Sequence, residues 1–318
     1  MKLTALKPFS LACLAALSLA ACGGEASKPA ESSASGAAPA AAGQGTLEKI
    51  KSSGTIVLGH RDSSIPFSYI ADQPNQPVGY AHDLQLKVVE AVKKELNMPD
   101  LKVRYNLVTS QNRIPLVSNG TVDLECGSTT NNLERQKQVD FSNAFFEIGT
   151  RLMAAKDAGI NGFGDLKGKT VVTTAGTTSE RLLKEYNDKE KLGMNIISAK
   201  DHGEAALMLF NGRAQAFMMD DILLAGERAK TPNPDNWVIV GEPMSFERYG
   251  CMVRKGDAPF KAVVDGALDA TFKNTAEIDA LYKKWFESPI PPKGVNLEFT
   301  MSAQVKEIIA NATEKAAE

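Results

Sequence analysis

The sequence predicts an α/β fold of two lobes, each a mostly parallel sheet with flanking helices. Apolar runs typical of strands alternate with stretches of helical periodicity. This alternation begins at Thr55 and restarts at Asp165. Two segments, 145–154 and 243–254, would cross between the halves and form a hinge. A hinge between two lobes makes a cleft that can close on a ligand.

The first series of elements contains three strands, each followed by a helix. The strands are expected at 55–59, 102–108 and 122–126, and the helices at 80–96, 111–118 and 131–138. In the longest helix Leu84, Val88 and Val92 recur at helical spacing, which gives the helix one apolar face. Thr130 or Asn131 would cap the third helix.

The second series repeats this alternation. Strands are expected at 169–174, 195–198, 214–219 and 237–240, and helices from Thr177 onward, at 203–210 and at 223–230. Thr177 and Glu180 have capping-box spacing, so a helix begins there, and its free amides suit an anion. The same pattern also describes an ordinary, well-capped helix. We expect the first lobe at 46–146 plus 249–318 and the second at 147–248.

The start of the chain indicates export. Residues 1–21 have a basic start and a short apolar stretch, typical of a secretory signal and too short to span a membrane. Leu19-Ala-Ala-Cys22 resembles a bacterial lipobox, which implies cleavage before Cys22 and lipid attached to its sulfur. The alternative is a soluble secreted protein whose cleavage site precedes a cysteine. Residues 22–45 are rich in Ala, Ser, Gly and Pro and read as a flexible tether.

Composition excludes several other classes. The formal net charge is −2, with no basic stripe for nucleic acid. Two cysteines remain beyond Cys22, and in an oxidising compartment Cys126 and Cys251 are expected to pair, the alternative being two buried free thiols. Neither belongs to a Cys-x-x-Cys pair, and the histidines lack metal-like spacing, so we expect no metal and no cofactor.

Three arginines point to an anionic ligand. Arg113 and Arg135 lie in a stretch dense in hydroxyl and amide side chains, and Arg61 directly follows the first strand. A guanidinium matches a carboxylate in two-point contact. Ligands bind at the carboxyl ends of parallel strands, where four residues would fall: Arg61, Ser110, Ser128 and Thr130. These features predict a pocket for a dicarboxylate, although three arginines alone are most often surface residues.

Eight stretches resemble the amino-acid-binding subunits of bacterial ABC importers, of the polar amino acid class. They are GHRDSSIPFSY, TSQNRIPL, ECGSTTNNLERQK, DFSNAFFEIGTRL, DLKGKTVVTTAGTTSE, ISAKDHGEA, AFMMDDILLAGERAK and WFESPIPPKG, which span nearly all of 54–294. Beyond Gly294 the match is weak. The resemblance implies the type II periplasmic-binding-protein fold, no catalytic activity, L-glutamate or L-aspartate as ligand, and ABC permease subunits in the inner membrane as partners. The lipobox and tether depart from the soluble relatives.

The resemblance also implies a role for each pocket residue. Arg135 would bind the α-carboxylate with Thr130 and Thr178, and Thr177 belongs to the same helix start. Asp220 would pair with the α-ammonium, assisted by Ser128. The side-chain carboxylate would be bound by Arg61, Ser110, Arg113 and His202. Phe67 and Tyr69 are expected to line the cleft.

Two other functions compete with import. Some dehydratases share this fold, and Ser128, His202 and Asp220 could form a triad, but no nucleophile-elbow motif is present. A sensory module would report amino acids to a membrane receptor through a partner. We expect import, with the protein monomeric in the periplasm or cell envelope and anchored to a membrane by lipid at Cys22.

Overall fold

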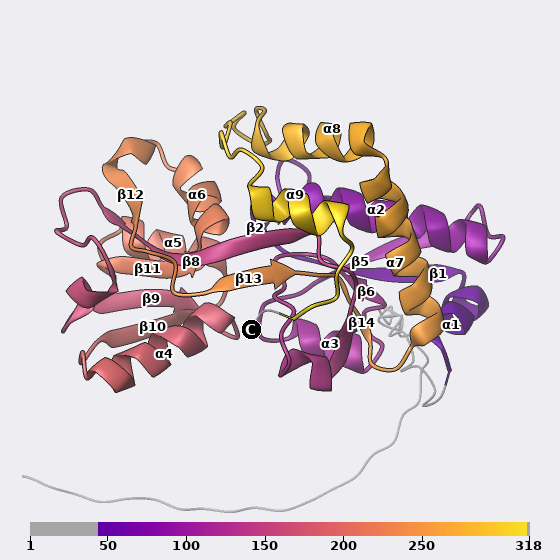
Figure 1. Ribbon diagram of the computed structural model, residues 1–318, viewed down its shortest axis with the longest axis horizontal. Coiled ribbons are helices and arrows are strands. Elements are labelled where there is room, and N and C mark those ends of the chain that lie inside the picture. The colour runs from indigo at the N-terminus through magenta and orange to yellow at the C-terminus, as the bar shows by residue number, and fades with distance from the viewer. Residues whose placement is uncertain (1–43, 317–318) are drawn as a thin grey trace, which may run out of the picture. The chain divides into compact units, whose positions relative to one another are not determined.

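The computed structural model describes residues 44–316 and places them in two lobes, each built on one sheet (Figure 1). The predicted signal, the lipidated Cys22 and the tether up to residue 43 lie outside the described residues. Among residues 44–316, no helix combines the length and the apolar character needed to cross a membrane.

Lobe 1 contains a five-stranded sheet in the order β5-β1-β6-β14-β7. Its strands are β1 (Thr55–His60), β5 (Lys102–Leu107), β6 (Leu124–Glu125), β7 (Val139–Phe141) and β14 (Met252–Arg254). Around it lie α1 (Thr46–Ser53), α2 (Tyr80–Glu95), α3 (Arg113–Ser118), η1 (Arg135–Lys137), α7 (Ala258–Lys273), α8 (Thr275–Phe286) and α9 (Ala303–Ala310). A small antiparallel sheet adds β2 (Ser63–Ser64), β3 (Ser68–Ile70) and β4 (Pro77–Val78).

Lobe 2 contains the second sheet, in the order β10-β9-β11-β8-β12, with β13 beside β8. Its strands are β8 (Phe146–Ala155), β9 (Thr170–Thr174), β10 (Asn195–Ala199), β11 (Ala216–Asp220), β12 (Trp237–Val240) and β13 (Phe246–Tyr249). The helices are η2 (Phe163–Leu166), α4 (Thr178–Glu190), α5 (His202–Phe210), α6 (Asp221–Ala229) and η3 (Pro234–Asn236).

The two sheets have corresponding strand orders, and each contains an antiparallel strand from a different crossing segment. In each sheet the first strand of the series lies between the second and the third, all parallel. The next strand runs antiparallel: β14 in lobe 1 and β8 in lobe 2. Both come from the crossings between the lobes, so the predicted mostly parallel sheets and the two crossing segments are confirmed.

The hinge is a pair of antiparallel strands, β8 and β13, that run side by side between the lobes (Figure 1). Its end in lobe 1 is anchored by aromatic rings: Phe146 lies 4.9 Å from Phe67 and 5.1 Å from Phe286, centroid to centroid. The prediction that Phe67 and Tyr69 line the cleft is wrong. Phe67 is buried in this aromatic cluster, and Tyr69 packs against Trp285 instead.

The helix predicted at 131–138 is also wrong: the chain is extended at 130–131, and helical structure is confined to one turn at 135–137. Thr130 forms an antiparallel bridge with Tyr249, and the amide of Asn131 donates to the carbonyl of Arg248 at 2.8 Å. Only the single turn η1 follows, with the amide of Arg135 donating to Asn132 Oδ1 at 2.9 Å. This extended stretch couples lobe 1 directly to the hinge strand β13.

A disulfide joins Cys126 to Cys251 across 125 positions of sequence, which is the pairing expected from the sequence. Cys126 directly follows β6, and Cys251 lies between β13 and β14. The bond therefore fixes the returning chain to the middle of the lobe 1 sheet.

We expect the Cys126→Ala/Cys251→Ala variant to lose about 2–5 kcal/mol of unfolding free energy, because the cross-link restricts a long loop in the unfolded chain. Urea denaturation followed by fluorescence would measure this loss, with Trp285 reporting on lobe 1 and Trp237 on lobe 2. The wild type treated with a reductant serves as the matched control. An unchanged midpoint in the variant and in the reduced protein would contradict this role.

Candidate functional site

The carboxyl ends of the parallel strands supply the candidate site from both lobes. In lobe 1, Arg61 directly follows β1, and Ser128 lies three residues beyond the end of β6. In lobe 2, Asp220 ends β11, and His202 follows β10 at the start of α5. Parallel strands in an open sheet present their ends at one edge, where ligands bind.

Two buried arginines carry N–H groups that have no acceptor within residues 44–316. Arg61, 1% exposed, donates through Nη2 to Ser110 Oγ at 3.0 Å, and its Nη1 has no hydrogen-bond partner among the described residues. Arg113, also 1% exposed, donates through Nη1 to the carbonyl of Ser128 at 2.9 Å, and its Nε has none there either. Buried donors of this kind are rare, so each points to a missing acceptor.

Positive charge accumulates at this point. Burial and repulsion by Arg113 lower the pKa of Arg61 to about 10. The same two causes lower the pKa of Arg135 to about 10. The buried carboxylate of Glu125 offsets part of this charge and accepts from Thr129 Oγ1 at 2.7 Å. An additional anion would stabilise all three arginines.

Arg135 connects the two lobes. Its Nη1 donates to the carbonyl of Thr130 at 2.9 Å, and its Nη2 approaches the carbonyl of Gly176 in lobe 2 at 3.4 Å. Gly176 has φ +78, and a Cβ there would lie 2.7 Å from the Cα of Gln111 in lobe 1. This positive φ favours glycine, and the close approach leaves no room for a Cβ.

The helix predicted from Thr177 begins as expected. Thr177 is the N-cap of α4, and its Oγ1 accepts from the amide of Glu180 at 3.0 Å. The amides of Thr178 and Ser179 lie in the first helical turn, where no intrahelical acceptor exists. Together with the positive end of the helix dipole they favour an anion beside Arg135.

Two buried carboxylates form the opposite side of the site. Asp220 accepts from Ser179 Oγ at 3.2 Å and from the hydroxyl of Tyr249. Glu247 accepts from the hydroxyls of Thr130 and Thr178, the latter at 2.6 Å. Burial and the charge of Glu247 raise the pKa of Asp220. Within the described part of the chain neither carboxylate forms an ion pair, so this side favours a cation.

His202 holds Arg61 in place. Arg61 Nη2 lies 3.3 Å from His202 Nε2, and His202 Nδ1 lies 2.9 Å from Thr174 Oγ1. Burial and the charges of Arg61 and Arg113 lower the pKa of His202 well below its ordinary value, so the ring is neutral. A guanidinium can only donate, hence Nε2 accepts and Nδ1 carries the proton.

The structure brings nine of the ten predicted residues together as buried side chains: Arg61, Ser110, Arg113, Ser128, Thr130, Arg135, Thr178, His202 and Asp220. Thr177 is half-buried and is engaged in capping, since its hydroxyl also donates to the carbonyl of Thr174 at 2.7 Å. Glu247 and Tyr249 were missed. Both lie in the hinge strand β13, which the sequence had identified only as a crossing.

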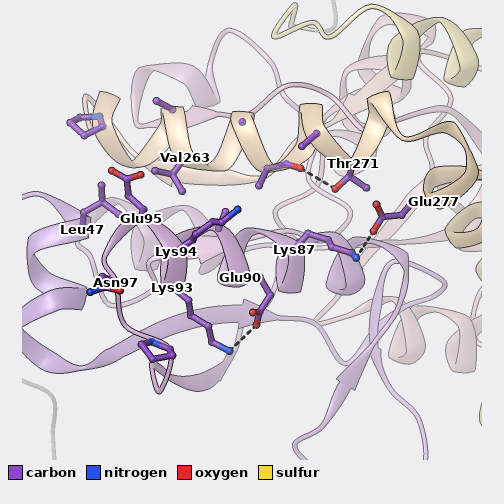
Figure 2. Close-up of a pocket in the computed structure, with 17 residues that line it drawn as sticks. Leu47, Lys87, Glu90, Lys93, Lys94, Glu95, Asn97, Val263, Thr271 and Glu277 are labelled. Carbon is purple, nitrogen blue, oxygen red and sulfur yellow. Dashed lines mark hydrogen bonds and ion pairs between the residues drawn. The ribbon is translucent and has the colours of Figure 1, made fainter.

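A groove of about 1310 Å³ between α2 and α7 lies apart from this cluster (Figure 2). None of the ten predicted residues lines it. Its rim carries charged side chains that pair with each other at the surface, such as Lys93 with Glu90 at 2.7 Å (Figure 2). Across residues 44–316, no group of three or more His, Cys, Asp or Glu side chains is placed to hold a metal ion.

The sequence matches the family described as bacterial extracellular solute-binding proteins, family 3, over residues 56–288. The chain belongs to this family. The L-glutamate/L-aspartate-binding protein of Pseudomonas aeruginosa is 69% identical over 274 residues, which cover 86% of this chain and 90% of that protein. The glutamate/aspartate import solute-binding protein of Escherichia coli is 54% identical over 280 residues, covering 88% and 91%.

A solved structure of an ancestral arginine-binding protein bound to arginine has the same fold. It aligns with a TM-score of 0.65 at 30% identity and covers 73% of this chain and 98% of that chain. Membership of the family, together with the two sheets, establishes the type II periplasmic-binding-protein fold. The chain is a solute-binding protein and not an enzyme.

We expect the ring of His202 to stay neutral and protonated at Nδ1 as the pH falls through 6.5, because its pKa is lowered well below that ordinary value. Nitrogen-15 NMR of the three histidine rings would measure this, and the His202→Gln spectrum would assign the signal. Titration of His202 near pH 6.5 would contradict the assigned contacts with Arg61 and Thr174.

Proposed function

We propose that this chain is the solute-binding component of an ABC amino-acid importer and that it captures L-glutamate or L-aspartate between its lobes. The observation that carries the proposal is charge complementarity. Three buried arginines, two of them with an N–H group that lacks an acceptor within residues 44–316, lie opposite two buried carboxylates that form no ion pair in that range. The acidic amino acids carry two carboxylates and one ammonium. The names of the Pseudomonas aeruginosa and Escherichia coli relatives support the same ligand class.

The α-carboxylate would be bound at the junction of the lobes by Arg135. The amide of Thr178 at the start of α4 is available to it. The amide of Thr130 is also free to donate to it. In the bridge to Tyr249 the hydrogen bonds are made by the residues on either side of Thr130, so the amide of Thr130 itself points away from β13. Thr177 contributes by holding the helix start in place through its cap.

The α-ammonium would lie beside Asp220, with Ser128 as a second acceptor. Ser128 Oγ donates to Ser64 Oγ at 3.1 Å, which leaves its lone pairs available. The side-chain carboxylate would then meet Arg61, Arg113 and Ser110. His202 takes part through Arg61, since its Nε2 accepts and cannot donate to a carboxylate.

Import requires the lobes to open and close around the hinge strands β8 and β13. Because the ligand contacts both lobes, it favours the closed state, which a membrane permease would then recognise. Lobe 1 would comprise 46–146 plus 249–318 and lobe 2 would comprise 147–248. The protein would be monomeric in the periplasm, tethered through residues 22–45 to lipid at Cys22, as the Leu-Ala-Ala-Cys sequence favours.

Titration calorimetry with glutamate, aspartate, glutamine, asparagine and arginine tests this function. We expect both acidic ligands to bind and both amides to bind much more weakly. The Arg61→Ala variant should lose about 2–4 kcal/mol of glutamate binding, because a buried carboxylate is left without its partner, and much less for glutamine.

Arg181→Ala is the matched control, since Arg181 is exposed on α4 and pairs only with Glu185 in the described part of the chain. Preference of the wild type for an uncharged or basic ligand would overturn the substrate. Equal losses of glutamate and glutamine in Arg61→Ala would overturn its role.

Glutamate affinity is expected to rise with pH up to the neutral range. The pKa of Asp220 is raised in the free protein, and a bound ammonium would lower it, so binding releases a proton between those two values. Calorimetry in two buffers of different ionisation enthalpy would measure the released proton. Asp220→Asn should remove the release and most of the affinity, whereas proton uptake by the wild type would contradict the placement of the ammonium.

A further inference from the structure

Glu247 is a buried carboxylate that receives hydrogen bonds from both lobes at one oxygen. Its Oε2 accepts from Oγ1 of Thr130 in lobe 1 and, at 2.6 Å, from Oγ1 of Thr178 in lobe 2. Its Oε1 accepts from Ser245 Oγ at 3.1 Å. Glu247 itself lies on β13, in register with Ile148 of β8. The proposed function uses only the charge of this residue and gives its two hydroxyl contacts no role.

These bonds fix which way the two hydroxyl groups point. A carboxylate can only accept hydrogen bonds, whereas a hydroxyl has one proton and two lone pairs. Thr130 and Thr178 each use their single proton on Glu247. Their oxygens can therefore only accept from any third group. A ligand carboxylate, which is itself only an acceptor, gains nothing from them.

An ammonium is the ligand group that suits such oxygens, because it only donates. Two neighbouring groups present the same polarity. Ser128 Oγ donates to Ser64 Oγ, and Asp220 is a carboxylate supported by Ser179 and Tyr249. The side of the site that faces Glu247 thus consists of acceptors, and the ligand carboxylates are left to the arginines and the helix amides.

We propose that Glu247 is a positioning residue that makes the hydroxyls of Thr130 and Thr178 acceptors for the α-ammonium, and so selects amino acids over diacids that lack the amine. This inference rests on the proposed function. The two threonines come from different lobes, so their acceptor pair is complete only when the lobes meet. Recognition of the amine and contact between the lobes thereby depend on the same carboxylate.

The Glu247→Gln variant of the full chain tests the inference with two ligands. Glutamate and glutarate share the chain length and both carboxylates, and only glutamate has the amine. An amide at this position keeps the size but offers a donor as well as an acceptor. We expect glutamate to bind at least tenfold more weakly and glutarate to change less than threefold, measured by calorimetry and by competition. Equal losses for both ligands, or no loss, would overturn the inference.

A matched control is available on the neighbouring hinge strand. Glu147 lies on β8, and its carboxylate pairs with Arg248 at 2.9 Å rather than with the threonines. Glu147→Gln should leave the ratio of the glutamate and glutarate affinities unchanged. Thermal unfolding of each variant separates a binding effect from a loss of folded protein.

A double-mutant cycle with Thr130→Val shows whether Glu247 acts through the hydroxyl. Thr130→Val keeps the shape of the side chain and removes its hydroxyl oxygen, so Thr130→Val and Glu247→Gln should each weaken the binding of glutamate selectively. The double variant should bind glutamate at most about threefold more weakly than the weaker-binding of the two single variants. Fully additive losses would overturn the mechanism. If Glu247→Gln fails to fold, the glutamate-to-glutarate ratio of Thr130→Val alone decides, and an unchanged ratio would overturn the inference.

Failure of the proposed function would look different. In that case the wild type would bind neither glutamate nor aspartate in calorimetry. If the wild type binds glutamate far more tightly than glutarate and Glu247→Gln preserves that ratio, the function stands and only the role of Glu247 falls.

Discussion

Three guanidinium groups are buried at the junction of two lobes, and the rest of the site depends on compensating their charge. Charges this deep are tolerated only with compensation, and Glu125 supplies part of it. The unmet N–H groups of Arg61 and Arg113 show where compensation is incomplete. On the other side of the site, Asp220 and Glu247 are buried carboxylates that form no ion pair within residues 44–316. The site therefore has uncompensated positive charge at the arginines and uncompensated negative charge at the acids, and a single zwitterionic diacid can compensate both.

The topology explains how residues so far apart in sequence arrive at one place. The two sheets have the same strand order, and each presents the carboxyl ends of three parallel strands. The antiparallel strand of each sheet comes from a segment that crosses between the lobes. The crossing pair β8 and β13 is anchored in lobe 1 by the rings around Phe146 and by the Cys126–Cys251 bond. Because Glu247 lies on β13, the hinge contributes a side chain to the site as well as a pivot.

Much of this fold could be predicted from the sequence, because its long strands and helices are periodic and its helix starts carry caps such as Thr177. Arg61 could be found because it follows a strand end, and Arg113 and Arg135 because they lie in a stretch dense in hydroxyl and amide side chains. The helix expected at 131–138 failed, since a tertiary bridge from Thr130 to Tyr249 overrides local preference. Glu247 was missed because an acid within a strand has no sequence signal for the hydroxyls it meets. Phe67 and Tyr69 were misplaced because aromatic residues suit a core and a pocket equally.

The position of β14 has a consequence for synthesis and export. This strand fills the middle of the lobe 1 sheet, between β6 and β7, yet it comes more than a hundred residues after either of them in the chain. A chain that emerges from its amino end therefore leaves β6 and β7 without their shared neighbour until residue 254 has followed. Over that interval the strands of lobe 2 are all available to pair. All strands of lobe 2 therefore precede the last strand of lobe 1, and Cys126 has no Cys251 to pair with until that part of the chain has followed.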